Sequence, residues 1–168
     1  MNKTSLALYF LLLSSWRPGS SQHSDDPAGA TYLAPGTWQK EMLDEVNQLR
    51  KAGCRCGRKY MPPALPLRWN NRLERACQLH AQDMDKNNFM GHQGSDGSGT
   101  GERAAKAHYN WQSVGENVSW NYDTPADAMI GWKTSPGHCR NMMSAEYKEM
   151  GAARQGNYYV QLFGRQWK

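Results

Sequence analysis

Four cysteines are the residues of this 168-residue chain whose chemistry is easiest to specify. Cys54 and Cys56 are separated by one residue, whereas Cys77 and Cys139 stand alone. In an exported protein, four cysteines favour two disulfides. A bond between Cys54 and Cys56 is sterically awkward, so we expect each to pair with Cys77 or Cys139. Zinc is the competing chemistry, but the cysteines lack the paired spacing typical of structural zinc sites.

Other polar residues that could support catalysis or metal binding lack suitable partners in the sequence. His80 and Asp83 form an i, i+3 pair on an expected helix, where a hydrogen-bonded core histidine is a simpler interpretation than a metal ligand. Ser135 precedes a proline without the context of a nucleophile elbow, so a serine hydrolase is not predicted. The Asp96-Gly97 loop lacks the spaced acids of an EF-hand, and His108 has no evident catalytic partner.

The first 21 residues have the features of a secretory signal peptide. Lys3 gives a positive start, residues 6–13 are almost wholly apolar, and small and polar residues follow. Because this apolar run is far shorter than the ~20 residues that a membrane-spanning helix needs, no transmembrane segment is expected. We interpret residues 22–36 as a flexible linker and residues 37–168 as one domain of a secreted protein, extracellular or periplasmic.

The charge of the chain gives little information about partners but argues against nucleic acid. The net charge is +5, and it becomes +3 when Lys3 and Arg17 leave with the signal peptide. A basic cluster between Arg50 and Lys59 is interpreted as a solvated surface around a turn. Nucleic-acid binding would need a larger basic footprint and a recognisable module, and the sequence has neither.

Hydrophobic spacing predicts two helices early in the domain. The first begins near Thr37 and stops at Gly53, and its apolar stripe comprises Trp38, Met42, Val46 and Leu49. The second begins after Asn70, a good N-cap, and its stripe comprises Leu73, Cys77, His80 and Met84. The second stripe predicts that Cys77 and His80 face the core.

The rest of the chain predicts loops, a third helix and a hairpin. Residues 57–66 and 91–101 are expected to be loops, and residues 115–120 a short strand. Thr124 is the N-cap of a helix that Ser135-Pro136-Gly137 should end. Residues 149–154 and 158–163 flank a short glycine-containing turn and should form a β-hairpin. This order of elements predicts a mixed α/β (α+β) fold with a mainly antiparallel sheet.

Between Glu41 and Gly164 the sequence resembles the CAP superfamily (cysteine-rich secretory proteins, antigen 5 and plant pathogenesis-related proteins), in a bacterial-type secreted form of its SCP domain. The matching segments are Trp69-Asn70 with His80-Ala81-Gln82-Asp83-Met84, then Asn88-Phe89-Met90-Gly91-His92, Arg103, Gly115-Glu116-Asn117, Trp132 with Ser135-Pro136-Gly137-His138, and Tyr159 with Gln161-Leu162-Phe163-Gly164. The family fold that this resemblance implies is a three-layer α-β-α sandwich.

The resemblance also implies a site and a disulfide pairing. His92, Glu116 and His138 are expected to converge in a cleft. A second glutamate follows the matching tryptophan in animal and plant members, but here Lys133, Thr134 and Ser135 follow Trp132, so the full tetrad is absent. The cysteine pattern resembles that of a bacterial subgroup and favours Cys56–Cys139, which leaves Cys54–Cys77.

Two histidines and one glutamate support three interpretations. They could ligate Zn²⁺ or another divalent metal, with water in the fourth position. Glu116 could instead act as a base beside hydrogen-bonding histidines, without a metal. The three could also form a buried hydrogen-bonded network that specifies the fold.

A binding module is the leading hypothesis, and catalysis is less favoured. The ligand would be a small molecule, a lipid such as a sterol, or a protein. Four aromatic residues could line an apolar groove, although packing is the simpler interpretation: Tyr109, Trp111, Trp120 and Tyr122. The alternative hypothesis is a metal-dependent hydrolase acting on extracellular peptide or cell-wall material. No cofactor is required for the binding role, and we expect a monomer.

Overall fold

A four-stranded sheet forms the centre of the computed structural model, which describes residues 35–167. The strand order is β3-β5-β6-β4, and β3 pairs with β5 in parallel whereas the other two pairings are antiparallel. The bounds of these strands are Arg68–Trp69 (β3), Trp111–Trp120 (β4), Glu149–Gln155 (β5) and Tyr158–Gln166 (β6). The predicted mainly antiparallel sheet and its closing hairpin are therefore confirmed.

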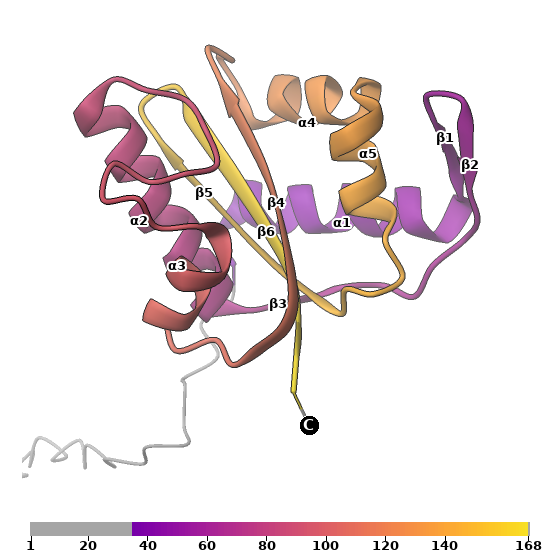
Figure 1. Ribbon diagram of the computed structural model, residues 1–168. Coiled ribbons are helices and arrows are strands. Elements are labelled where there is room, and N and C mark those ends of the chain that lie inside the picture. Colours follow the sequence, from indigo (N-terminus) through magenta and orange to yellow (C-terminus); the bar gives the residue numbers. More distant parts are fainter. Residues whose placement is uncertain (1–34, 168) are drawn as a thin grey trace, which may run out of the picture. The chain divides into compact units, whose positions relative to one another are not determined.

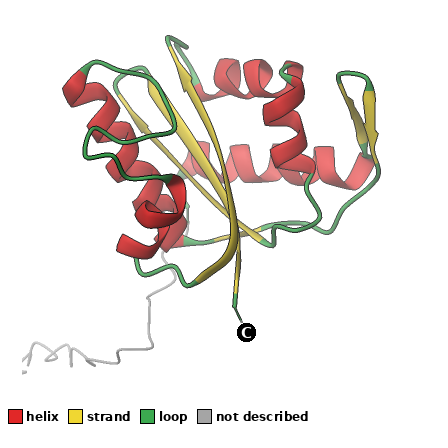
Figure 2. Cartoon of the chain, in the orientation of Figure 1, coloured by secondary structure: helices red, strands yellow, loops and turns green. Residues whose placement is uncertain are grey.

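Helices cover both faces of this sheet (Figure 1). One face packs against α2 and α3, and the other against α1, α4 and α5 (Figure 2). Their bounds are Thr37–Ala52 (α1), Asn71–Asn87 (α2), Thr100–Lys106 (α3), Pro125–Thr134 (α4) and Pro136–Met143 (α5). Each face has its own apolar core, so the predicted three-layer α-β-α arrangement is confirmed.

The ends of α1 and α2 follow from their capping residues. The side chain of Asn70 accepts hydrogen bonds from the backbone of Arg72 and Leu73, which satisfies two unpaired amides at the start of α2. Gly53 ends α1 with a φ of +70°, a conformation that costs glycine little. The stripe predicted for α2 is buried as expected, including His80 and Cys77.

The sequence interpretation missed two helices and one small sheet. Helix α3 begins inside the expected loop, because the Glu102 carboxylate accepts a hydrogen bond from the Gly99 amide at 2.7 Å and caps the first turn. The chain does leave α4 at Ser135, but Pro136 occupies the first turn of a new helix, α5, where proline is favoured. Strand β1 (Cys54–Cys56) precedes the segment expected to be a loop, and it pairs with β2 (Lys59–Met61), which lies within that segment.

The structure contains the Cys56–Cys139 disulfide, with a Cα–Cα distance of 5.4 Å, which ties β1 to α5. The expected Cys54–Cys77 disulfide is wrong, because both residues are free thiols. Cys77 lies on α2, fully buried in the core between that helix and the sheet. Cys54 lies on β1, in a separate cluster with the disulfide and Met143. The two thiols therefore belong to different packing layers.

The expected signal peptide and most of the expected linker lie outside the described residues. Within residues 35–167, no helix is long and apolar enough to cross a membrane.

Candidate functional site

Glu116 is the buried centre of the candidate site. It lies on β4, the edge strand of the four-stranded sheet in the described domain, and its side chain is only 2% exposed. Oε1 accepts a hydrogen bond from His92 Nδ1 at 2.8 Å, and Oε2 accepts one from Arg103 Nη2 at 2.8 Å. Both carboxylate oxygens therefore already have charge-assisted partners.

His92 is the exposed member of this cluster. It lies in the loop between α2 and α3, and its side chain is 60% exposed. A carboxylate only accepts hydrogen bonds, so Nδ1 must carry the proton that reaches Glu116. In the neutral imidazole this leaves a lone pair on Nε2, the nitrogen directed away from the carboxylate.

Arg103 connects the carboxylate to the loop that carries His92. It comes from α3 and is buried, and its guanidinium donates to Glu116 and to the carbonyl oxygens of His92 and Ser98 at 2.9 and 2.7 Å. The sequence pattern matched Arg103 to the family but gave it no role. The structure shows that one side chain holds both the backbone and the hydrogen-bonding partner of His92.

His80 lies behind Glu116 as a core histidine, as predicted. It is fully buried on α2, and its Nε2 donates to the Gly91 carbonyl at 2.8 Å while lying 3.9 Å from Glu116 Oε1. Burial lowers the pKa of His80, although the charge of Glu116 acts in the opposite direction. His80 therefore holds the backbone next to His92 through Gly91 and packs beside Glu116 on β4.

The charges of His92 and Glu116 stabilise each other. The hydrogen bond to Glu116 raises the pKa of His92 above its ordinary value, against a smaller effect of burial. Burial alone would raise the pKa of Glu116, but the hydrogen bond from His92 and the charge of Arg103 together lower it. The carboxylate is therefore ionised at neutral pH.

His138 approaches from the opposite layer of the fold. It lies in the first turn of α5, half-buried, and burial followed by the positive charge of His92 lowers its pKa. Asn117, the residue after Glu116, turns to this face of the sheet and donates to the His138 carbonyl at 3.3 Å. Asn141 of α5 donates to the Glu116 carbonyl at 3.0 Å. Through Asn117 and Asn141, the segment of β4 that carries Glu116 is therefore hydrogen-bonded to the helix that carries His138.

These positions test how the three predicted residues fit a metal ion. Among residues 35–167, the group of three or more potential ligands lying within 4.8 Å of one another is Cys54, Cys56 and Cys139, and not His92, Glu116 and His138. Glu116 is buried and each of its oxygens already accepts a charge-assisted hydrogen bond, from His92 or from Arg103, which disfavours it as a direct metal ligand. The donor set fits a different arrangement, in which imidazole nitrogens bind the ion and Glu116 orients His92 as an outer carboxylate.

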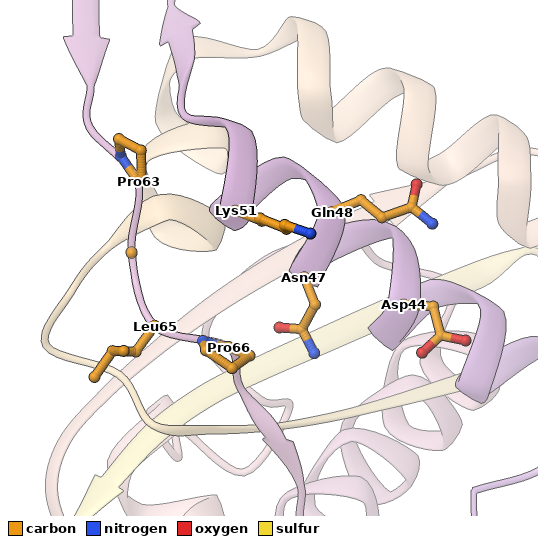
Figure 3. Close-up of a pocket in the computed structure, with 8 residues that line it drawn as sticks. Asp44, Asn47, Gln48, Lys51, Pro63, Leu65 and Pro66 are labelled. Carbon is orange, nitrogen blue, oxygen red and sulfur yellow. The ribbon is translucent and has the colours of Figure 1, made fainter.

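A pocket of about 680 Å³ lies elsewhere in the domain (Figure 3). Asn47 and Lys51 of α1 form one wall, and Pro63, Leu65 and Pro66 form the other. None of its lining residues belongs to the histidine and glutamate set. The predicted cleft at that set stays a prediction.

The aromatic residues considered for an apolar groove have separate roles. Tyr109 is fully buried, and its hydroxyl donates to Glu149 at 2.7 Å. Trp120 is 53% exposed and stacks on Tyr158 with ring centroids 6.2 Å apart. Packing, the simpler interpretation, therefore holds for Tyr109, and a lipid ligand stays a prediction.

Comparison with known proteins decides the family. The family model described as "CAP: Cysteine-rich secretory protein family" matches residues 43–163, which include the whole His92, Arg103 and Glu116 cluster. The chain belongs to the CAP family. This agrees with the resemblance seen in its sequence motifs.

Individual proteins resemble this chain in sequence or in fold. The chain is 30% identical over 133 residues to "Uncharacterized membrane protein YlbC" of Bacillus subtilis (strain 168), covering 78% of this chain and 35% of that protein. The chain therefore spans about a third of the length of that relative. A solved extracellular protein containing a SCP domain from Bacillus anthracis str. Ames has a TM-score of 0.69 at 22% identity, covering 77% of this chain and 40% of that one. An outer surface protein from Borrelia burgdorferi has a TM-score of 0.65 at 19% identity, covering 76% of this chain and 92% of that one.

Proposed function

We propose that this CAP domain is an exported binding module that contacts its ligand through Nε2 of His92, with His138 as a second contact. Glu116 and Arg103 are positioning residues in this proposal. The ligand class that suits such a site is a divalent metal ion such as Zn²⁺, held alone or together with a small molecule. Imidazole nitrogen is a common ligand for this class of ion.

The contrast in exposure between His92 and Glu116 carries the proposal. The carboxylate is 2% exposed and has both oxygens engaged, whereas the imidazole that it holds is 60% exposed. A carboxylate that fixes the tautomer and ring orientation of a histidine increases its basicity and prepares the other nitrogen for a metal. A bound ion would act as a Lewis acid and as an anchor for an anionic group of a ligand.

The arrangement supports binding better than the alternative of a metal-dependent hydrolase. A general base must reach the proton of the attacking water with a free lone pair. Glu116 is poorly placed for this role because its side chain is only 2% exposed and the cationic Arg103 and the hydrogen bond from His92 lower its pKa, which makes it a weaker base. A hydrolase would have to use the exposed His92 as its base, and the sequence lacks the second glutamate of the full tetrad.

Zinc titration of the purified protein by calorimetry tests the proposal. We expect one zinc ion per chain, at least a tenfold loss of affinity in His92→Ala and His138→Ala, and about a 10–100-fold loss in Glu116→Gln. His108→Asn is the matched control, because His108 is exposed, lies at the end of α3 and has a φ of +61° that asparagine tolerates. Binding that is equal in the wild type and in the His92 and His138 variants would refute the proposal.

A further inference from the structure

Three sulfur atoms converge where the β1–β2 hairpin meets α5. The free thiol of Cys54 lies 3.7 Å from Cys139 Sγ and 3.8 Å from Cys56 Sγ, the two atoms of the disulfide. This cluster is separate from the histidine and glutamate site. It also differs from a buried structural disulfide, because a thiol in van der Waals contact with a disulfide is a potential nucleophile toward it.

The hairpin presents Cys54 and Cys56 in equivalent positions. Both lie on β1, two residues apart, so the pleat of the strand directs their side chains to the same face. That face packs against α5, and the apolar cluster there contains Cys54, Cys56, Cys139 and Met143. Either cysteine of β1 can therefore meet Cys139 after only a small shift of the strand.

We propose that Cys54 exchanges with Cys56 as the disulfide partner of Cys139. The Cys54 thiol loses its proton and its sulfur attacks Cys139 Sγ. The Cys54–Cys139 bond forms, the Cys56–Cys139 bond breaks, and the sulfur of Cys56 leaves with the electron pair and takes up a proton. The step needs no external oxidant or reductant, because one disulfide and one thiol are present before and after it.

The position of Cys54 sets a condition for this exchange. Its distances to the two disulfide sulfurs are nearly equal, so the thiol lies beside the bond and not in line behind Cys139. A rotation of the Cys54 side chain or a shift of the hairpin must therefore precede attack. Cys54 is only half-buried and its strand neighbour Arg55 is exposed, which leaves room for such a movement.

The exchange has a definite structural consequence. Cys139 stays bonded in both isomers, so α5, which carries His138, remains tied to the hairpin. What changes is the point of attachment, by two residues along β1, and the identity of the free thiol. The disulfide between the hairpin and α5 can thus isomerise within the domain, without reduction by an external thiol.

Linkage mapping by mass spectrometry tests the proposal on the full chain. The protein is incubated at mildly alkaline pH, and acid stops the exchange at chosen times. Each sample is then denatured in the presence of excess maleimide, which labels the free thiols. The protein is digested, and the labelled peptides are sequenced by fragmentation. Cys77, the other free thiol, is labelled throughout. Among Cys54, Cys56 and Cys139, we expect maleimide mainly on Cys54 at the start and a growing fraction on Cys56 with time, at a rate independent of protein concentration. Absence of maleimide from Cys56 at all times would overturn the proposal, as would a rate of Cys56 labelling that rises with protein concentration.

Three variants separate this exchange from other reactions. Cys54→Ser must leave Cys56 unlabelled, because label there would show adventitious reduction. Cys77→Ala removes the other free thiol and must leave the labelling of Cys56 unchanged. Cys56→Ser must form a Cys54–Cys139 disulfide within the monomer, and a free Cys54 or a disulfide-linked dimer in its place would contradict the proposed equivalence.

Discussion

The imidazole of His92 donates through Nδ1 to Oε1 of Glu116 at 2.8 Å, joining an exposed loop side chain to a buried carboxylate. Arg103 donates to the other oxygen of the same carboxylate and to the backbone of His92. The orientation of His92 is therefore set by a buried charge network, and changes in this network should alter the exposed ring without touching it.

Replacing Glu116 by glutamine should destabilise the domain by about 3 kcal/mol or more, because it leaves the buried Arg103 without its counter-charge. Urea denaturation measures the loss. Asp44→Asn is the control: Asp44 forms an exposed ion pair with Lys40 on α1, and its removal should cost less than about 1 kcal/mol. Equal losses in the two variants would show that the Glu116 network contributes no more than a surface pair.

The pKa of His92 should lie above its ordinary value, and the sign of its effect on stability follows. Because the pKa is raised on folding, the stabilisation is fully present below the unfolded value of 6.5 and is lost as pH rises through the folded pKa. The free energy of unfolding of the wild type, minus that of His92→Gln, should decrease over that range. A difference that grows with rising pH would contradict the assigned hydrogen bond.

His138 should respond to the charge of His92. Burial and the positive charge of His92 lower the pKa of His138, so His92→Gln should raise it toward its ordinary value. Titration of the imidazole resonances by NMR measures the change directly. An unchanged His138 pKa would show that the two rings do not interact electrostatically.

Arg50 should be essential for stability although it is remote from the site. It is fully buried on α1 and donates to the carbonyl oxygens of Leu65, Met142 and Ser144 at 2.7, 2.7 and 2.9 Å. Burial lowers its pKa to about 10. Arg50→Met should cost about 3 kcal/mol or more in urea denaturation, because these carbonyls lose their donors. The control is Lys51→Met, at the exposed neighbouring residue, which should change the free energy of unfolding by only about 0.5 kcal/mol. Equal losses in the two variants would contradict a stabilising role for the hydrogen bonds of Arg50.

Two glycines should respond to alanine in opposite ways. A Cβ on Gly151 of β5 would clash with the backbone amide of Glu74, so Gly151→Ala must push α2 away from the sheet. A Cβ on Gly137 of α5 would have nothing within 4 Å of it, so alanine there should stabilise the helix by up to about 1 kcal/mol. Thermal unfolding of both variants distinguishes them, and a tolerated Gly151→Ala would contradict the close packing of α2 on β5.

The elements that the sequence predicted correctly carry strong local signals. The apolar stripe of α2 and its Asn70 cap are sufficient to place His80 and Cys77 in the core. The missed helices α3 and α5 are short, at seven and eight residues. Gly99 precedes α3 and Pro136 begins α5, and both residue types are common in loops. Their apolar periodicity extends over too few turns to be read, so only the tertiary packing reveals them.

The candidate site was only partly predictable, because the contacts among its residues are set by tertiary packing around β4 and not by local sequence. Motif matching identified His92, Glu116 and His138, but it could not show that Arg103 donates to the second oxygen of the carboxylate. The cysteines show the same limit. Their number suggested two disulfides, whereas the fold places Cys77 in one layer and Cys54 against another.

The tautomer of His92 decides whether Glu116 prepares the ring to bind a ligand through Nε2. Long-range ¹H–¹⁵N correlation of the imidazole nitrogens, at a pH where the ring is neutral, identifies which nitrogen carries the proton. We expect a proton on Nδ1, an unprotonated Nε2, and a shift of the Nε2 resonance when zinc is added. A proton on Nε2, or a zinc-induced shift confined to Nδ1, would contradict it.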